Sequence, residues 1–229
     1  MELTLDELDC DGALREAAER VGTTTRADLV RGAVVGGAAF VAALTLADDV
    51  GAATGPAASD VDILNYALTL EYLQADFYSE SEREGALRGR AARASKVVGA
   101  VERAHVKALR SVLGRAAVAK PSFNFRGVTE RQDPFLKTAV AFEDLAVAAY
   151  KGQAGKIKSK PLLVAAISIH SVEARHAAWM RYLFGITPAA TAFDDALSRP
   201  AVERIVASTR FVTSRPTTTR SGRSPRLTG

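Results

Sequence analysis

Hydrophobic residues in the central part of the chain recur at intervals of three and four positions, the period of a helix with one buried face. Four long segments show this pattern, and capping residues, Pro and Gly set their limits. They run from Ser59 or Asp60 to about Arg83, from about Ala92 to Ala117, from Asp133-Pro134 to about Tyr150, and from near Pro161 to Phe184-Gly185. No alternation of apolar and polar residues is long enough to predict a strand. The pattern therefore predicts an all-α bundle of four helices.

The lengths of the connections predict how these helices are joined. Connections 84–91 and 151–160 are short, so each is expected to join two antiparallel neighbours. Connection 118–132 is longer, and its fifteen residues, when extended, reach up to about 50 Å, enough to run the length of a bundle. We therefore expect two helical hairpins joined by one long crossover between helices two and three. A short amphipathic fifth helix is predicted from Pro200 to about Phe211.

An uncharged apolar segment at 33–47 precedes the bundle and follows a polar segment at 1–32. As a helix it would reach roughly 22 Å, which is short of the hydrocarbon core of a bilayer and typical of an export signal. Residues Thr25 to Arg31 resemble the twin-arginine export motif, except that Ala27 replaces the second arginine. We expect a leader at 1–58, with transient membrane contact, and favour an exported or membrane-associated protein over a cytoplasmic one.

Composition and charge exclude several kinds of site. The chain has 229 residues, of which 48% are hydrophobic, and a single cysteine, Cys10. A disulfide, a cysteine-based zinc site and an iron–sulfur cluster are therefore excluded. The net charge of +4 is uneven, because residues 1–32 carry −4 and residues 213–229 carry four Arg and no acid. We expect 213–229 to be a soluble, disordered tail that does not bind nucleic acid, and the folded domain to occupy 59–212.

Glutamates and histidines occupy matching positions in the four predicted helices. Helices two and four each carry Glu and His three residues apart, and helices one and three each carry a Glu at a similar depth. Residues three apart share one helix face, so four carboxylates and two imidazoles would meet inside the bundle. This is a ligand set for two divalent metal ions, whose charge would nearly cancel that of the carboxylates. The expected ligands are Glu71, Glu102, His105, Glu143, Glu173 and His176.

These residues make the chain similar to the ferritin-like di-iron carboxylate proteins, over roughly residues 59–212. The first helix, Asp62 to Tyr78, resembles the bacterial branch that includes desiccation-related proteins. The resemblance implies a ferritin-like bundle that holds two Fe ions, with Mn as an alternative. It also implies that Tyr78 lies near the metal centre as a hydrogen-bond donor or redox-active catalytic group. Val101 and Arg103 flank Glu102, where a haem-binding relative has Met, so haem is not implied.

The same resemblance implies a di-iron oxidoreductase of ferroxidase or peroxide-scavenging type in stress protection, with O2 or peroxide as the small-molecule substrate. Two alternatives stay open: a di-manganese, catalase-like enzyme, and a non-catalytic metal-binding or structural envelope stress protein. The apolar N-terminal segment fits poorly into a 24-chain shell, so we expect a monomer or a dimer.

Four further residues near the expected ligands have weaker signals. His170, three residues before Glu173, is either a partner of a ligand carboxylate or a packed helix residue. Tyr72 and Tyr150 are expected to pack in the core rather than to contact the site. Asp144 points about 100° away from its neighbour Glu143 around the helix and is expected to be solvated.

Overall fold

The computed structural model describes residues 57–214. Its helices are α4 (Ala58–Glu84), α5 (Gly89–Leu113), α6 (Gln132–Ala154), α7 (Lys160–Phe184) and the shorter α8 (Arg199–Thr209). No helix within these residues is both long and apolar enough to cross a membrane. The leader predicted for 1–58 falls outside the described residues, apart from its last two, as does the Arg-rich tail beyond Ser214.

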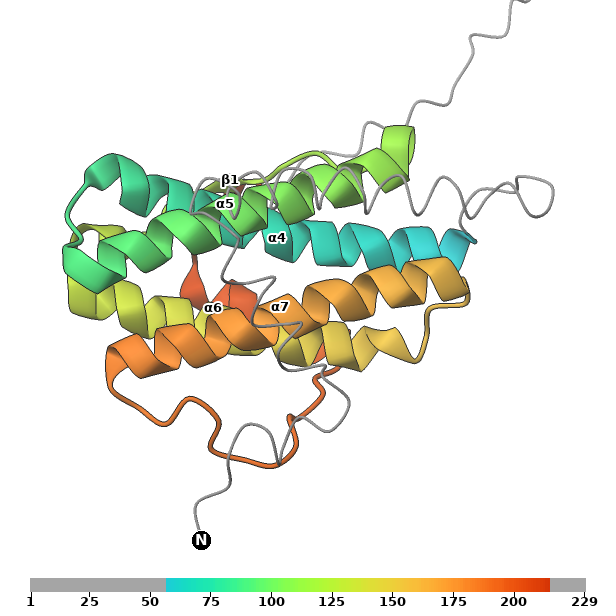
Figure 1. Cartoon of the computed structure of the whole chain (residues 1–229). Helices are drawn as coiled ribbons and strands as arrows, with labels where there is room; N and C mark the ends of the chain where they lie inside the picture. Colours follow the sequence, from blue (N-terminus) through green and yellow to red (C-terminus); the bar gives the residue numbers. More distant parts are fainter. Residues whose placement is uncertain (1–56, 215–229) are drawn as a thin grey trace, which may run out of the picture.

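The long helices form the predicted all-α bundle. Helix α4 packs mainly along α5 and α6 mainly along α7, so the two hairpins are as expected. Fewer contacts join α4 to α6 and α5 to α7, which closes the four helices around a common interior. Figure 1 shows the four helices lying side by side, with a long connection between α5 and α6. The four-helix bundle with one long crossover and a fifth short helix is therefore confirmed.

Helix ends differ from the predicted ones by a few residues. Helix α5 begins at Gly89 and ends at Leu113, because a 3-10 turn at Gly114–Ala116 replaces its expected last turn. The N-caps of α4 and α6 are Ala57 and Arg131, so the prediction of Ser59 or Asp60 and of Asp133 as N-caps was wrong. Asp60 lies in the first turn of α4, where its buried carboxylate accepts the backbone N–H groups of Lys158 and Ser159 at 3.0 and 2.9 Å. It fixes the α6–α7 connection instead of capping its own helix.

Glycine ends α4 and α7 as predicted. Gly85 and Gly185 have φ angles of 62° and 83°, a left-handed conformation that glycine adopts at little cost. Ser159 precedes α7, and its side chain accepts the backbone N–H of Leu162. Local sequence therefore determines both ends of α7, the helix that carries Glu173 and His176.

The crossover between α5 and α6 is held against α4 along its length. Asn65 accepts the backbone N–H of Val118 at 2.8 Å, and Thr129 donates to Glu80 at 2.7 Å. Between these points the ring of Phe125 enters the core. The crossover thus covers one side of the bundle and adds to its interior.

A short antiparallel sheet joins the crossover to the end of the described chain. Strand β1 (Ser122–Phe123) pairs with β2 (Val212–Ser214), which follows α8. The prediction of no strand was wrong here, because two and three residues are too few to show an alternating pattern. The pairing extends to Ser214, two residues beyond the expected end of the domain.

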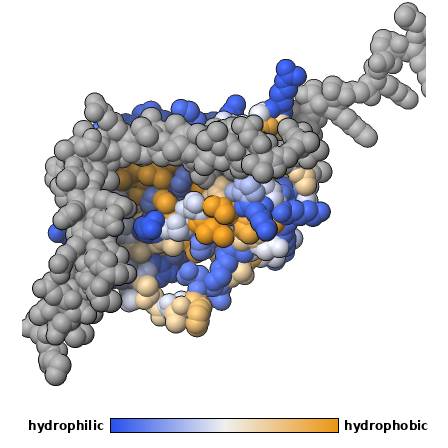
Figure 2. All heavy atoms as spheres, turned by 45° about the vertical axis from the view of Figure 1, so that its right-hand side comes forward, coloured by the Kyte–Doolittle hydropathy of each residue, from blue (hydrophilic) through white to orange (hydrophobic). Residues whose placement is uncertain are grey.

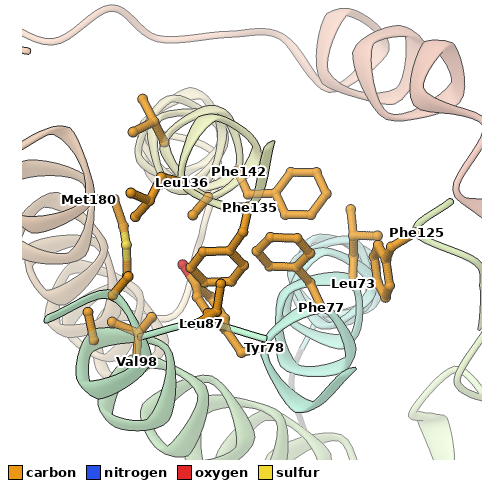
Figure 3. Close-up of a cluster of buried hydrophobic side chains, with 14 of the residues drawn as sticks. Leu73, Phe77, Tyr78, Leu87, Val98, Phe125, Phe135, Leu136, Phe142 and Met180 are labelled. Carbon is orange, nitrogen blue, oxygen red and sulfur yellow. The ribbon is translucent and has the colours of Figure 1, made fainter. Parts of the chain in front are cut away.

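Aromatic residues fill the interior between α4 and α6. The ring of Phe77 is fully buried and lies 5.1 to 5.4 Å from those of Phe125, Phe135 and Phe142. Figure 3 shows these rings gathered among the helices, with the hydroxyl oxygen of Tyr78 directed toward the middle of the bundle. This cluster packs directly against one of the predicted site residues, because Tyr78 follows Phe77 on α4 and their rings are 5.2 Å apart.

The connection from α7 to α8 crosses α6 very closely at Gly152. A Cβ atom at Gly152 would overlap the carbonyl oxygen of Leu197, whose backbone N–H donates to Ala148 at 3.0 Å. We expect Gly152→Ala to lower the free energy of unfolding by about 1–3 kcal/mol, because the connection must move away. Gly155→Ala is the matched control, since Gly155 has open space and a φ of −67°. Urea denaturation checks this, and equal stability of the two variants would contradict the close packing.

Candidate metal centre

The six expected ligands lie together in the middle of the bundle. Glu71 comes from α4, Glu102 and His105 from α5, Glu143 from α6, and Glu173 and His176 from α7. All four carboxylate side chains are fully buried, and the two imidazoles are 12% and 8% exposed. The rings of His105 and His176 are 6.5 Å apart. Helical spacing within each chain segment and the antiparallel hairpins thus bring all six residues to one depth.

These residues form two groups that share two glutamates. The first contains Glu71, Glu102, His105 and Glu173, and the second contains Glu102, Glu143, Glu173 and His176, with donor atoms within 4.8 Å of one another in each group. In the first group, His105 Nδ1 lies 3.3, 3.4 and 3.1 Å from oxygens of Glu71, Glu102 and Glu173. In the second, His176 Nδ1 lies 2.9, 3.5 and 4.0 Å from Glu102, Glu143 and Glu173. Glu102 and Glu173 therefore stand between the two imidazoles.

Donor atoms in this cluster are buried but do not hydrogen-bond to one another. The atoms without a hydrogen-bond partner are Glu71 Oε2, both oxygens of Glu102, His105 Nδ1, Glu143 Oε2, both oxygens of Glu173, and His176 Nδ1. Leaving so many buried polar atoms unpaired is costly unless something else binds them. Two ligand atoms that lie 90° apart around one ion, each about 2.1 Å from it, are about 3.0 Å from each other. This is close to the shorter distances between imidazole Nδ1 atoms and carboxylate oxygens in the cluster. The donor set therefore fits two divalent metal ions.

Two tyrosines orient the outer carboxylates. The hydroxyl of Tyr78 donates to Glu143 Oε1, and the hydroxyl of Tyr150 donates to Glu71 Oε1 at 2.5 Å. Each bond leaves the second oxygen of that carboxylate directed to the cluster without a partner. Tyr78 thus lies beside the cluster, as the family resemblance implied. The assignment of Tyr150 to core packing alone was wrong, because its hydroxyl contacts an expected ligand.

Burial and neighbouring charge control protonation in the metal-free cluster. Burial raises the pKa of Glu71 to about 7, and burial together with Glu102 and Glu71 raises the pKa of Glu173 well above its usual range. Burial would also raise the pKa of Glu102, but the imidazoles of His105 and His176 outweigh it and lower that pKa. The metal-free cluster therefore holds protons at neutral pH, and divalent cations would displace them.

Other candidate residues contribute to structure around the cluster. The charged groups that act on the half-buried His170 are Lys151 of α6 and Asp194 of the α7–α8 connection, and no ligand carboxylate is among them. Asp144 is not simply solvated, because it accepts two hydrogen bonds from Arg181 at 2.9 and 2.7 Å. Tyr72 packs in the core, and its hydroxyl accepts a hydrogen bond from Arg110 at 2.6 Å.

Removal of either orienting hydroxyl is expected to weaken metal binding. Tyr78→Phe and Tyr150→Phe each leave a buried carboxylate oxygen without its donor and free the carboxylate to rotate, which we expect to lower metal affinity roughly tenfold. Tyr72→Phe is the matched control, because Tyr72 is equally buried but bonds away from the cluster. Anaerobic calorimetric titration with Fe(II) measures the three affinities. Equal affinities would show that the hydroxyls do not orient the ligands.

Comparison with known protein families gives a match to this part of the chain. The model of a family described as a ferritin-like domain matches residues 59–185, more than half of the chain. The matched region runs from the start of α4 to the end of α7 and so includes the whole cluster and both orienting tyrosines. No curated protein matches the chain.

Proposed function

The chain belongs to the ferritin-like domain family, and from this we propose that it is a di-iron oxidoreductase that reduces O2 or a peroxide at the buried cluster. One observation carries the proposal: eight buried donor atoms without hydrogen-bond partners form two groups that share two glutamates. A purely structural bundle would have no need for four buried carboxylates that repel one another. The family and the metal-binding cluster are the premise, and the activity is what we infer from them.

Each residue of the cluster has a place in this proposal. Glu71 and His105 would hold one ion, Glu143 and His176 would hold the other, and Glu102 and Glu173 would bind both. Two bound iron ions supply the electrons that reduce the oxidant. Four carboxylates and neutral imidazoles balance the charge of the ions in an interior where no Lys or Arg of residues 57–214 pairs with these carboxylates.

Tyr78 and Tyr150 serve as proton-bearing groups beside the cluster. Burial and the adjacent glutamates raise the pKa of each hydroxyl well above its usual range, so both stay protonated. They therefore donate hydrogen bonds to Glu143 and Glu71 and do not act as bases. Reduction of hydrogen peroxide to two water molecules consumes two protons and two electrons. The protonatable carboxylates of Glu71 and Glu173 hold protons close to where they are consumed.

Anaerobic loading with Fe(II), followed by hydrogen peroxide or O2, tests this activity. We expect bound Fe(II) to be oxidised faster than free Fe(II) in the same buffer, with one hydrogen peroxide consumed for every two Fe(II). The variant Glu102→Gln/Glu173→Gln, which lacks the shared carboxylates, is the control and is expected to show only the free rate. Iron that binds but is oxidised no faster than free iron would reject the oxidoreductase and leave a non-catalytic metal protein. If the Mn(II)-loaded chain releases O2 rapidly from peroxide and the Fe(II)-loaded chain does not, the di-manganese, catalase-like enzyme would be favoured.

A further inference from the structure

Charged residues are divided unevenly between the helices of the bundle. Helices α4 and α6 carry ten acidic and three basic residues, whereas α5 and α7 carry two acidic and nine basic residues. The two acids on α5 and α7 are Glu102 and Glu173, both fully buried in the cluster. Every exposed charge on α5 and α7 is therefore positive.

These positive charges share one side of the molecule. Helices α5 and α7 are neighbours, and Arg90 on α5 reaches Tyr182 on α7 with an Nη1–hydroxyl distance of 3.5 Å. Two of the basic side chains do have acidic partners on the adjacent helices. Arg103 pairs with Glu82 on α4, and Arg181 pairs with Asp144 on α6. We call five of the exposed cations on these helices without an acidic partner within residues 57–214 the basic face: Arg90, Arg93, Lys96, Lys107 and Arg175. Two others are left out, because Arg110 donates to Tyr72 on α4 and Lys160 is the first residue of α7.

The side of the bundle that carries the basic face also exposes apolar residues. Val97 on α5 and Val164 on α7 are 44% and 64% exposed, and Val101 and Ala104 continue the stripe of Val97 along α5. Figure 2, turned by 45° from Figure 1, shows exposed hydrophobic residues bordered by hydrophilic ones. Exposed apolar side chains beside charged ones are common in protein–protein contact surfaces. The opposite side of the bundle is different, because α8 and the crossover pack over it.

The metal cluster comes closest to solvent on this same side. Of its six residues, only His105 and His176 retain exposed side-chain surface, and they belong to α5 and α7. Their rings are neighbours across the two helices. An electron donor bound to the basic face would therefore be separated from the cluster by little more than these two imidazoles.

We propose that the basic face is the docking site of an acidic electron-transfer protein that reduces the metal centre. The proposal rests on the proposed function, which requires electrons from outside after each turnover. Complementary charge accelerates encounter and orients the donor, and transient redox complexes need only a small contact area. A one-electron donor of the flavin or iron–sulfur type would transfer one electron at each of two encounters. Two encounters restore both metal ions after one peroxide has been reduced to water.

An acidic protein fits this face better than a lipid surface does. Peripheral helices that enter a bilayer present Trp, Phe or Leu on their apolar side. The large apolar side chains exposed on α5 and α7 are Val97, Val164, Ile167, Tyr182 and Phe184. Of these only Phe184, the last residue of α7, is of that kind. The most exposed aromatic residue among 57–214, Phe193, lies instead in the connection between α7 and α8.

Binding and reduction by a flavodoxin, an acidic one-electron donor, test the proposal on the full metal-loaded chain. We expect oxidised flavodoxin to bind at about 20 mM salt and to bind roughly tenfold more weakly at about 200 mM. The variant Lys107→Glu/Arg175→Glu should weaken binding, and slow reduction of the centre by flavodoxin hydroquinone, by about tenfold or more. The control variant Lys137→Glu/Arg204→Glu makes the same change in net charge on α6 and α8. It should alter flavodoxin binding and the rate of reduction by less than about twofold.

Three binding results would overturn the proposal. They are the absence of salt-sensitive binding, equal losses in the two variants, and binding to phosphatidylglycerol vesicles through the same residues without binding to flavodoxin. Flavodoxin that binds the metal-loaded chain but does not reduce it would also overturn it. Binding itself does not require metal, so a chain that binds flavodoxin as expected but holds no metal would reject the proposed function and retain the docking face.

Discussion

Replacing Glu102 and Glu173 together with glutamine will abolish binding of both metal ions. These two residues are the only members shared by both donor groups, so their loss removes two carboxylates from each group. A neutral amide cannot balance the charge of a divalent ion in a buried site, and we expect affinity to fall by more than about 100-fold. Metal analysis after anaerobic loading with Fe(II), followed by desalting, measures the loss.

The single variant Glu173→Gln should not destabilise the metal-free chain. Burial and repulsion by Glu102 and Glu71 raise the pKa of Glu173 well above its usual range, so the ionised form of Glu173 is unfavourable without metal. Glutamine keeps the size of the side chain and removes the charge, so we expect a melting temperature equal to or above that of the metal-free wild type. Glu84→Gln/Glu130→Gln, at two exposed acids, is the control and should change neither metal content nor melting temperature. Retention of two ions by Glu102→Gln/Glu173→Gln would show that the cluster is not the binding site.

Phe77→Ala is expected to cause the largest loss of stability. The ring is fully buried and contacts four other aromatic rings, those of Tyr78, Phe125, Phe135 and Phe142. Removing it leaves a cavity among side chains from α4, α6 and the crossover, which cannot all move inward together. We expect a cost of about 3–5 kcal/mol in the free energy of unfolding, measured by urea denaturation of the metal-free chain.

Phe193→Ala provides the matched comparison for this loss. The side chain of Phe193 is 86% exposed, so the same truncation should change the free energy of unfolding by less than about 0.5 kcal/mol. Similar losses in the two variants would contradict the position of Phe77 at the centre of the core. A large loss in Phe193→Ala alone would instead indicate that the connection between α7 and α8 packs against something outside residues 57–214.

Helical periodicity explains why the bundle and the cluster could be predicted from sequence. Glu102 and His105, like Glu173 and His176, are three residues apart and must share a helix face once the segment is helical. Short connections then make the hairpins antiparallel, which brings residues at matching depth together. The same reasoning could have identified Tyr150. It follows Glu143 by seven residues, as Tyr78 follows Glu71, and the two hairpins repeat this spacing.

Contacts between distant segments could not be predicted in this way. Ser59 or Asp60 was expected to cap α4, but the carboxylate of Asp60 accepts hydrogen bonds from backbone N–H groups nearly a hundred residues later. The pairing of β1 with β2 and of Arg181 with Asp144 likewise depends on which sides of the helices meet. No local pattern contains that information. The separation of charge between α4 and α6 on one side and α5 and α7 on the other also becomes apparent only when the helices are placed, because the net charge of +4 hides it.

Anaerobic titration of the metal-free chain with Fe(II), with metal content determined after desalting, tests the central claim most directly. The two groups of buried donors predict two ions bound per chain, with protons released on binding because the metal-free cluster holds protons at neutral pH. The loaded chain should also melt at a higher temperature than the metal-free chain, since metal binds only the folded form. A chain that binds no Fe(II) or Mn(II), or that binds one ion equally well without Glu102 and Glu173, would contradict the account.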